Sequence, residues 1–148
     1  MTGEKFISKE DMSKMIDDCI EDLKDGGTKL IDLAHLMQYV GETKNDEVFL
    51  ALFAPIWGFS SEILRFREIG LLPMIPQDLK GRYNKVLTKA IEAGQKALND
   101  LKVLLCEKDN INYGKFVSII ARLHKHQFAM MREWSRIPRI RSEQFGQS

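Results

Sequence analysis

Cysteine and proline are scarce in this chain, which has two cysteines and four prolines among 148 residues. Cys19 and Cys106 show neither CxxC spacing nor the spacing of a zinc finger, so zinc modules and disulfide scaffolds are not indicated. Both fall on apolar helical positions, where we expect buried free thiols. Because proline interrupts helices, its scarcity leaves long stretches in which helices can form.

Signals for strands and for secretion are also lacking. No stretch sustains an alternation of apolar and polar residues, and no Asn-Gly pair marks a hairpin turn. The first residues, MTGEKFISKE, lack the apolar region of a signal peptide, so we expect a cytoplasmic protein. With 44% hydrophobic and 29% charged residues, the composition predicts a single globular domain over residues 1–148.

The most apolar part of the chain is a run of twelve residues, VFLALFAPIWGF, from Val48 to Phe59. Spanning a membrane takes about 20 apolar residues, so the run predicts a core helix instead. Pro55 removes one backbone donor, and we expect a kink there. The side chains of Phe53 and Trp57 are expected to be nearly inaccessible to solvent.

Helical periodicity and capping residues predict five helices. The first runs from the cap Ser8 to the glycines at 26–27, and the second runs from the cap Thr28 to Gly41. The third runs from Thr43 to about Leu72, and the fourth runs from Pro76 for about thirty residues. The fifth runs from the polar turn at 108–112 to just before Pro138. We therefore expect an all-α, up-down helical bundle of four long helices plus one shorter helix, with a flexible tail from about residue 138.

Two helices carry specific packing predictions. The fourth has a heptad seam with small residues at its centre, where we expect a neighbouring helix to insert Trp57 or Phe128. The seam comprises Tyr83, Leu87, Ala90, Gly94, Ala97, Leu101 and Leu104. The fifth is expected to bury one stripe and to leave Ile119 and Met130 outside it, so that apolar surface remains for self-association. That stripe comprises Tyr113, Phe116, Val117, Ile120, Leu123, Phe128, Met131 and Trp134.

Residues with catalytic or metal-binding chemistry form no recognisable set. His124 and His126 are two apart, so on a helix they face different directions, and no acid precedes either one at the spacing of a di-iron site. Asp32 and His35 have that spacing alone, and an ion pair within one helix explains Glu62 and Arg65. We predict no metal site and no catalytic residues, and the sequence indicates no particular cofactor.

Charge is unevenly distributed along the chain. Residues 1–50 hold twelve acids against six Lys or Arg, and residues 115–148 hold seven Lys or Arg against two acids. The basic end favours either binding of an anion or an acidic partner, or a solvated helix end whose cations suit the helix dipole. The arginines concerned are Arg122, Arg132, Arg136, Arg139 and Arg141. A nucleic-acid partner is not indicated, because the basic excess does not extend over the whole domain.

Three short stretches resemble the cobalamin adenosyltransferases, which are trimeric helical bundles with a ferritin-like arrangement. The stretch 25–28 (DGGT) is similar to part of their phosphate loop, 41–47 (GETKNDE) to one of their helix starts, and Phe116-Val117 with Ala121-Arg122 to a pattern on their last long helix. The resemblance implies a nucleotide- or cofactor-binding bundle and a trimer. Asn110, Asn112 and Tyr113 stand where the family has an Arg and a Ser-Asp pair, so the catalytic motif is absent.

Two hypotheses about function follow. The first is a non-enzymatic assembly or interaction protein that forms a homo-oligomer, a trimer if the resemblance holds and a dimer otherwise. The alternative is a nucleotide- or cofactor-binding bundle related to the adenosyltransferases. No membrane partner is expected.

Overall fold

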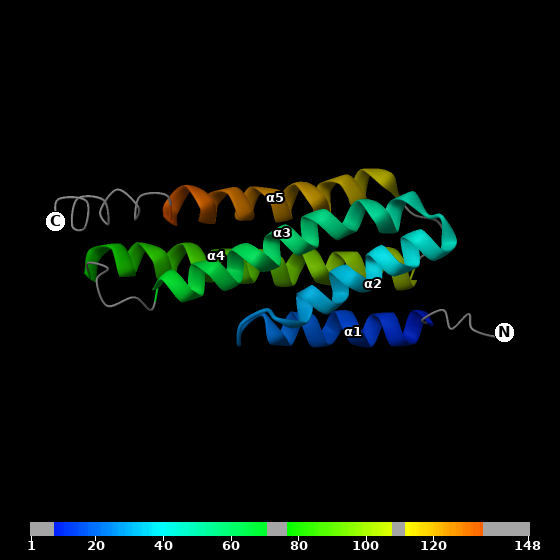
Figure 1. The fold of residues 1–148 in the computed structure, drawn as a ribbon, viewed down its shortest axis with the longest axis horizontal. Helices are drawn as coiled ribbons and strands as arrows, with labels where there is room; N and C mark the ends of the chain where they lie inside the picture. Colours follow the sequence, from blue (N-terminus) through cyan, green and yellow to red (C-terminus); the bar gives the residue numbers. More distant parts are fainter. Residues whose placement is uncertain (1–7, 71–76, 108–111, 135–148) are drawn as a thin grey trace.

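A computed structural model describes residues 8–70, 77–107 and 112–134 (Figure 1). These residues form α1 (Lys9–Asp22), α2 (Lys29–Lys44), α3 (Glu47–Gly70), α4 (Gln77–Lys102), a π-helical turn η1 (Val103–Glu107) and α5 (Tyr113–Trp134). The described residues include no strand, so the prediction of an all-α fold is confirmed. The predicted tail from residue 138 lies outside the described residues.

The helices lie side by side along one common direction, with α3 between α2 and α5 (Figure 1). α3 also contacts α4, while α1 packs on α2, α4 and η1. In α1 and α2, the core is formed by one stripe of each helix, because each helix has only one apolar side. The buried residues are Met12, Ile16, Cys19 and Leu23 on one side and Leu30, Leu33, Ala34, Met37 and Val40 on the other.

The cap predicted at Ser8 is confirmed, since its hydroxyl accepts a hydrogen bond of 3.0 Å from the Asp11 amide. The cap predicted at Thr28 is wrong, because the Thr28 side chain makes no capping bond. Asp22, the last residue of α1, takes this role: its Oδ2 accepts a 2.9 Å bond from the amide of Lys29. Satisfying this free amide couples the end of α1 to the start of α2.

The boundary between α2 and α3 differs from the prediction. α2 continues through Gly41 to Lys44 and ends at Asn45, which has a left-handed φ of +52°. α3 then begins at Glu47, with the Asp46 carboxylate accepting a 2.9 Å bond from the Val48 amide. Gly41 serves close packing rather than termination, because a Cβ there would lie 2.6 Å from Leu50 Cγ.

The prediction that Phe53 and Trp57 lie in the core is wrong. Trp57 is 39% exposed and Phe53 is half-buried. The inward face of α3 instead carries Leu52, Ile56, Phe59, Ile63 and Phe66. A run that is apolar on every side does not reveal which side faces the core, and the helical period places Trp57 on the opposite side from Phe59.

The small-residue seam of α4 is buried as predicted, apart from half-buried Leu87. The side chain that fills its centre is Phe59 of α3, and the prediction of Trp57 or Phe128 is wrong. A Cβ at Gly94 would lie 2.7 Å from Phe59 Cε2, so only glycine permits this contact. Pro76, the expected first residue of this helix, lies outside the described residues.

The predicted inward face of α5 is only partly right, since Phe116 and Leu123 are buried as predicted. The structure also buries Ile119 and Met130, which were expected outside the stripe, and Glu133. Several residues of the predicted stripe are exposed instead, and these are Tyr113, Val117, Phe128 and Met131. Because α5 is apolar over much of its circumference, only its neighbours α3 and α4 determine which residues are covered. Nothing is described of the Trp134 side chain.

α3 is apolar enough to satisfy the length and hydropathy criteria for a membrane span. Its segment Glu47–Glu68 has a mean hydropathy of 1.4, and 44% of its most apolar window is buried. The core helix of a soluble protein satisfies the same criteria. On the side of α3 that faces away from the core, Leu50 and Trp57 are exposed to solvent.

Candidate functional site

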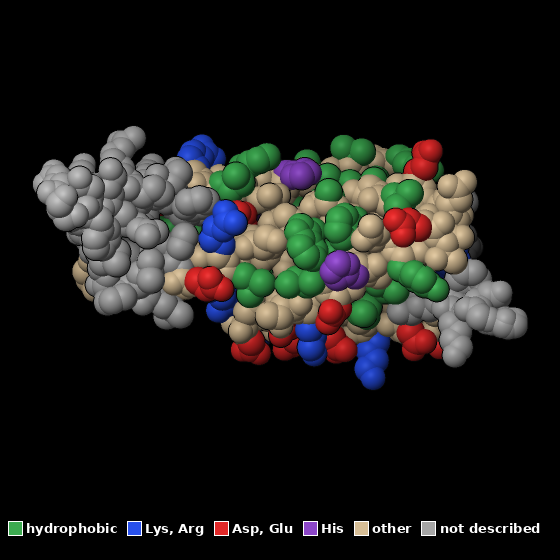
Figure 2. All heavy atoms as spheres, in the orientation of Figure 1, with side chains coloured by type: hydrophobic (Ala, Val, Ile, Leu, Met, Phe, Trp, Pro, Cys, Tyr) green, Lys and Arg blue, Asp and Glu red, His purple; other side chains and the backbone are tan. Residues whose placement is uncertain are grey.

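The large hydrophobic side chains exposed on the described residues all belong to α2, α3 and α5. There are seven of them: Tyr39, Leu50, Trp57, Tyr113, Val117, Phe128 and Met131. Together with half-buried Phe53, these residues are called the apolar face. Figure 2 shows hydrophobic side chains gathered over the middle of α3, with α2 on one side and α5 on the other. Phe128 and Val117 are 55% and 60% exposed, so much of this surface is in contact with water.

Two aromatic groups make up the centre of the apolar face. In the first, Phe53 and Trp57 stack with ring centroids 5.8 Å apart, and His35 of α2 meets Trp57 edge-on at 5.2 Å. In the second, His124 and Phe128 of α5 stack at 5.9 Å. The two groups border the same contact between α3 and α5, where a Cβ at Gly58 would lie 2.7 Å from Gln127 Nε2.

Charged residues flank the apolar face on both sides. On α2, the acids Asp32 and Glu42 and the lysines Lys29 and Lys44 are exposed, whereas the exposed charges of α5 are all basic. Asp32 lies one turn before His35, and Lys125 lies two residues before Gln127, so both lie close to the level of Trp57 along α3. At this level, the apolar middle is therefore flanked by the acid Asp32 on α2 and by the base Lys125 on α5.

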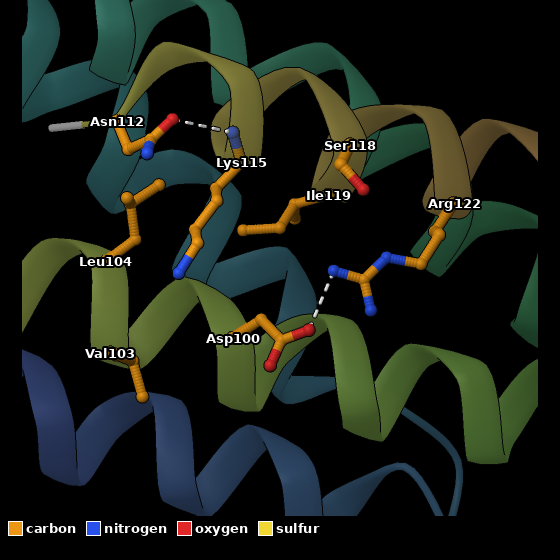
Figure 3. A pocket seen from close by; sticks show the side chains of 8 residues that line it. All are labelled: Asp100, Val103, Leu104, Asn112, Lys115, Ser118, Ile119 and Arg122. Carbon is orange, nitrogen blue, oxygen red and sulfur yellow. Dashed lines mark hydrogen bonds and ion pairs between the residues drawn. The ribbon is translucent and has the colours of Figure 1, made fainter.

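A separate cavity of about 580 Å³, called the charged pocket, lies between α5 and the end of α4 with η1 (Figure 3). Its lining consists of Asp100, Val103, Leu104, Asn112, Lys115, Ser118, Ile119 and Arg122. Arg122 forms a 2.7 Å ion pair with Asp100. Asn112 caps α5 by accepting a 3.1 Å bond from the Lys115 amide, as the polar turn predicted.

Two buried acids and a buried phenol connect α3, α4 and α5. Glu62 is 5% exposed and lies 3.8 Å from Arg65, which confirms the ion pair expected within α3. Glu133 is 8% exposed and pairs with Arg82 of α4 at 3.0 Å. Burial, together with the charges of Glu133 and Glu62, raises the pKa of Tyr83 above its usual 10.0. The pairing of each acid with an arginine gives the cluster a structural role.

Two of the arginines predicted as one basic group, Arg122 and Arg132, lie among the described residues, and these two lie apart. Arg122 lines the charged pocket, whereas Arg132 is exposed and is not part of its lining. Ten residues of helix separate the two and rotate their side chains about 80° apart. Arg136, Arg139 and Arg141 lie outside the described residues. The pocket residues Asp100 and Lys115 were missed, because the two belong to helices whose proximity only the fold determines.

The histidines and acids of the described ranges do not gather into a group that could hold a metal ion. Burial, with a contribution from the neighbouring charge of Lys125, lowers the pKa of His126 below its usual 6.5. His124 and His126 therefore do not provide a metal centre with the residues described.

The three stretches that carry the family resemblance occupy different places. The turn at 25–28 and the turn at 41–47 lie at opposite ends of α2, which at 16 residues is about 24 Å long. The second and third stretches do meet, because Asp46, Glu47 and Phe116 line a common cavity of about 480 Å³. The fold thus brings two of the three stretches together at one cavity.

Comparison of the chain with protein families, with curated proteins and with solved structures finds no match.

Proposed function

We propose that this chain is a non-enzymatic interaction protein, an up-down helical bundle that binds a second copy of itself through the apolar face. The observation that carries the proposal is the concentration of exposed large hydrophobic side chains on α2, α3 and α5. Apolar patches with a polar rim are typical of protein contacts, because covering them removes apolar area from water at about 25 cal/mol per Å².

The apolar face is bounded in the way that a contact surface is. Along the outward side of α3, Leu50 and Trp57 are followed by the polar residues Ser61 and Glu68. The apolar part therefore covers the first half of the helix only. A helix whose outward side merely tolerated hydrophobic residues would show them scattered singly. Here they are adjacent, and the rings of Phe53 and Trp57 are already packed together for a partner to cover.

A second copy of this chain suits the apolar face because Asp32 and Lys125 place opposite charges on its two sides. A two-fold axis parallel to α3 sets α3 of one copy on α3 of the other and exchanges the two edges. Asp32 then lies opposite Lys125 of the partner subunit, and the same contact occurs twice. Such complementarity selects this orientation over one that would place like charges opposite each other.

Sedimentation equilibrium at micromolar concentration tests this function. The expected species has twice the chain mass of 17.1 kDa. Trp57→Glu places two carboxylates at the centre of the contact, so it is expected to yield the single-chain mass with helical content unchanged. Asn84→Glu is the matched control, because it adds the same charge at an exposed position of α4.

Two outcomes contradict the proposal. One is a wild-type protein of single-chain mass at all concentrations. The other is a single-chain species that floats with phosphatidylcholine vesicles in wild type and not in Trp57→Glu, since a lipid surface would then be the partner.

One observation favours a second candidate, a trimeric nucleotide-binding bundle with the ferritin-like arrangement of the cobalamin adenosyltransferases. Two of the three resembling stretches border the 480 Å³ cavity, which Lys44 also lines. ATP in saturating excess would raise the melting temperature of such a protein through linkage. An unchanged melting temperature removes this candidate and leaves the interaction protein.

A further inference from the structure

We infer that the charged pocket is a binding site for a small organic anion, a carboxylate or a phosphate monoester with an apolar body. The pocket lies apart from the apolar face. On α5, the pocket is lined from positions 115, 118, 119 and 122, whereas the apolar face takes positions 113, 117, 128 and 131. At 3.6 residues per turn, these two sets lie on nearly opposite sides of the helix.

Polar side chains from two helices point into the same space. Figure 3 shows Lys115, Ser118 and Arg122 reaching from successive turns of α5 toward α4, with Asp100 reaching up between the two cations. The Asp100 carboxylate is 2.7 Å from Arg122 and compensates its charge. No carboxylate of the described residues forms an ion pair with Lys115, so the pocket holds one positive charge in excess.

The place of Lys115 in α5 strengthens the preference for an anion. α5 begins at Tyr113, so Lys115 lies in its first turn. The positive end of the helix dipole disfavours a cation at this position, and a bound anion would offset both the dipole and the ammonium group. In addition, Arg122 Nε is buried without a hydrogen-bond partner, which leaves a charged donor unsatisfied within the described structure.

The remaining walls specify the rest of the ligand. Val103, Leu104 and Ile119 supply the apolar part of the lining. Val103 and Leu104 belong to η1, the π-helical turn that directly follows the last residue of α4. A cavity of about 580 Å³ has the size of a small-molecule site. The lining therefore fits a negatively charged head on a carbon body.

Phenyl phosphate and benzoate are suitable probes, because each combines an anionic head with an apolar ring. Both are titrated into ¹⁵N-labelled protein at constant ionic strength, with benzyl alcohol as the uncharged analogue. We expect at least one anion to give saturable amide shifts at Lys115, Ser118 and Ile119, and benzyl alcohol to give none. The anion that saturates at lower concentration distinguishes a phosphate site from a carboxylate site.

Lys115→Met is expected to weaken the anion's apparent affinity about tenfold, as the loss of one charge-assisted contact should. Lys96→Met is the matched control, since Lys96 is exposed on α4 one turn before Asp100 and outside the lining. Ser118→Ala provides a milder second variant should the first disturb the fold. The inference is overturned if neither anion gives saturable shifts, if benzyl alcohol shifts the same amides equally, or if Lys115→Met and Lys96→Met bind alike.

Discussion

Three glycines set the distances at which α3 meets its neighbours. In each case, an added Cβ would lie within 2.7 Å of an atom of a neighbouring helix. The close pairs are Gly41 of α2 with Leu50, Gly58 of α3 with Gln127, and Gly94 of α4 with Phe59. Distances this short do not occur between packed atoms, so each helix pair approaches closely only because a side chain is missing. α3 takes part in all three contacts and is the helix around which the others are arranged.

Gly94→Ala is therefore expected to destabilise the protein, even though alanine favours a helix. The propensity gain is about 1 kcal/mol. The clash with the Phe59 ring, at 2.7 Å from its Cε2, is expected to outweigh it and leave a net loss of about 1–3 kcal/mol. Gly81→Ala in the same helix meets nothing within 4 Å and should stabilise by up to about 1 kcal/mol. Urea denaturation measures both. Equal stabilisation by the two variants would show that α3 and α4 are not in close contact.

Two buried groups predict a loss of stability in alkali. Burial, followed by the charges of Asp22 and Asp18, raises the pKa of Cys19 from 9.0 to about 12. The thiol also donates a hydrogen bond of 3.4 Å to the Lys29 carbonyl oxygen. Tyr83 is shifted upward as well, chiefly by burial. Above about pH 9, the unfolded chain loses protons that the folded chain retains, so each such group lowers the unfolding free energy as the pH rises.

The expected slope is about 1.4 kcal/mol per pH unit for each group that is ionised only in the unfolded chain. Unfolding free energies are compared at pH 7, 9, 10 and 11. Cys19→Ala and Tyr83→Phe should each flatten the alkaline decline, whatever their effect at neutral pH. An alkaline slope that neither substitution changes would mean that these groups ionise equally in the folded and unfolded chains.

At the scale of elements, the turn between α1 and α2 depends on one carboxylate. The backbone carbonyl of Asp22 accepts bonds from the amides of Gly26 and Gly27, and its side chain caps α2. From α3, Arg67 donates to the carbonyl oxygens of Leu23 and Lys24 at 2.8 and 3.0 Å. The end of α1 is thus attached to both helices that follow it.

Asp22→Ala is expected to cost about 0.5–2 kcal/mol, the usual loss when a helix cap is removed. Asp25→Ala removes an exposed carboxylate from the same turn and should change stability by less than about 0.5 kcal/mol. The two variants are compared by thermal melting followed by circular dichroism. If both cost the same, the general charge of the turn matters and the cap at Lys29 does not.

The helices themselves could be predicted, but the side that two of them turn inward could not. In α1 and α2, apolar residues occupy one side, which is the side that the structure buries, as Ile16 and Leu33 show. In α3 and α5, apolar residues occupy more than one side, and Trp57 and Phe128 were placed in the core although both are exposed. Gly41 was interpreted as a helix end because a glycine that permits close packing looks the same in sequence. In each case, the missing information was the identity of the neighbouring helix.

The charged pocket illustrates the same limit. Arg122 was predicted as an anion-binding residue from the basic character of the chain's end. Its partner Asp100 and the nearby Lys115 were not, because the turn from α4 into η1 and the placement of α5 bring them together. Spacing along the chain carries no signal for a pair 22 residues apart on different helices.

At the scale of the whole molecule, the two sides of the described structure differ. α1 and α4 expose no large hydrophobic side chain among the described residues, whereas α2, α3 and α5 expose seven. α3 is therefore buried unequally on its two sides. The side that carries Phe59 lies in the core, and the side that carries Trp57 is exposed. A molecule with one apolar side, flanked by Asp32 and by Lys125, has the features needed for a two-fold dimer.

The central claim, association of two copies through the apolar face, is tested most directly by reversing its charged edges. Asp32→Lys and Lys125→Asp are made singly and together, and the dimer dissociation constant is measured by sedimentation equilibrium at low salt. Each single reversal should weaken the dimer several-fold by placing like charges opposite each other, at a cost of about 1 kcal/mol. The double reversal should restore wild-type affinity. Single reversals without effect, or a double reversal whose loss equals the sum of the two single losses, would contradict this arrangement of the two copies.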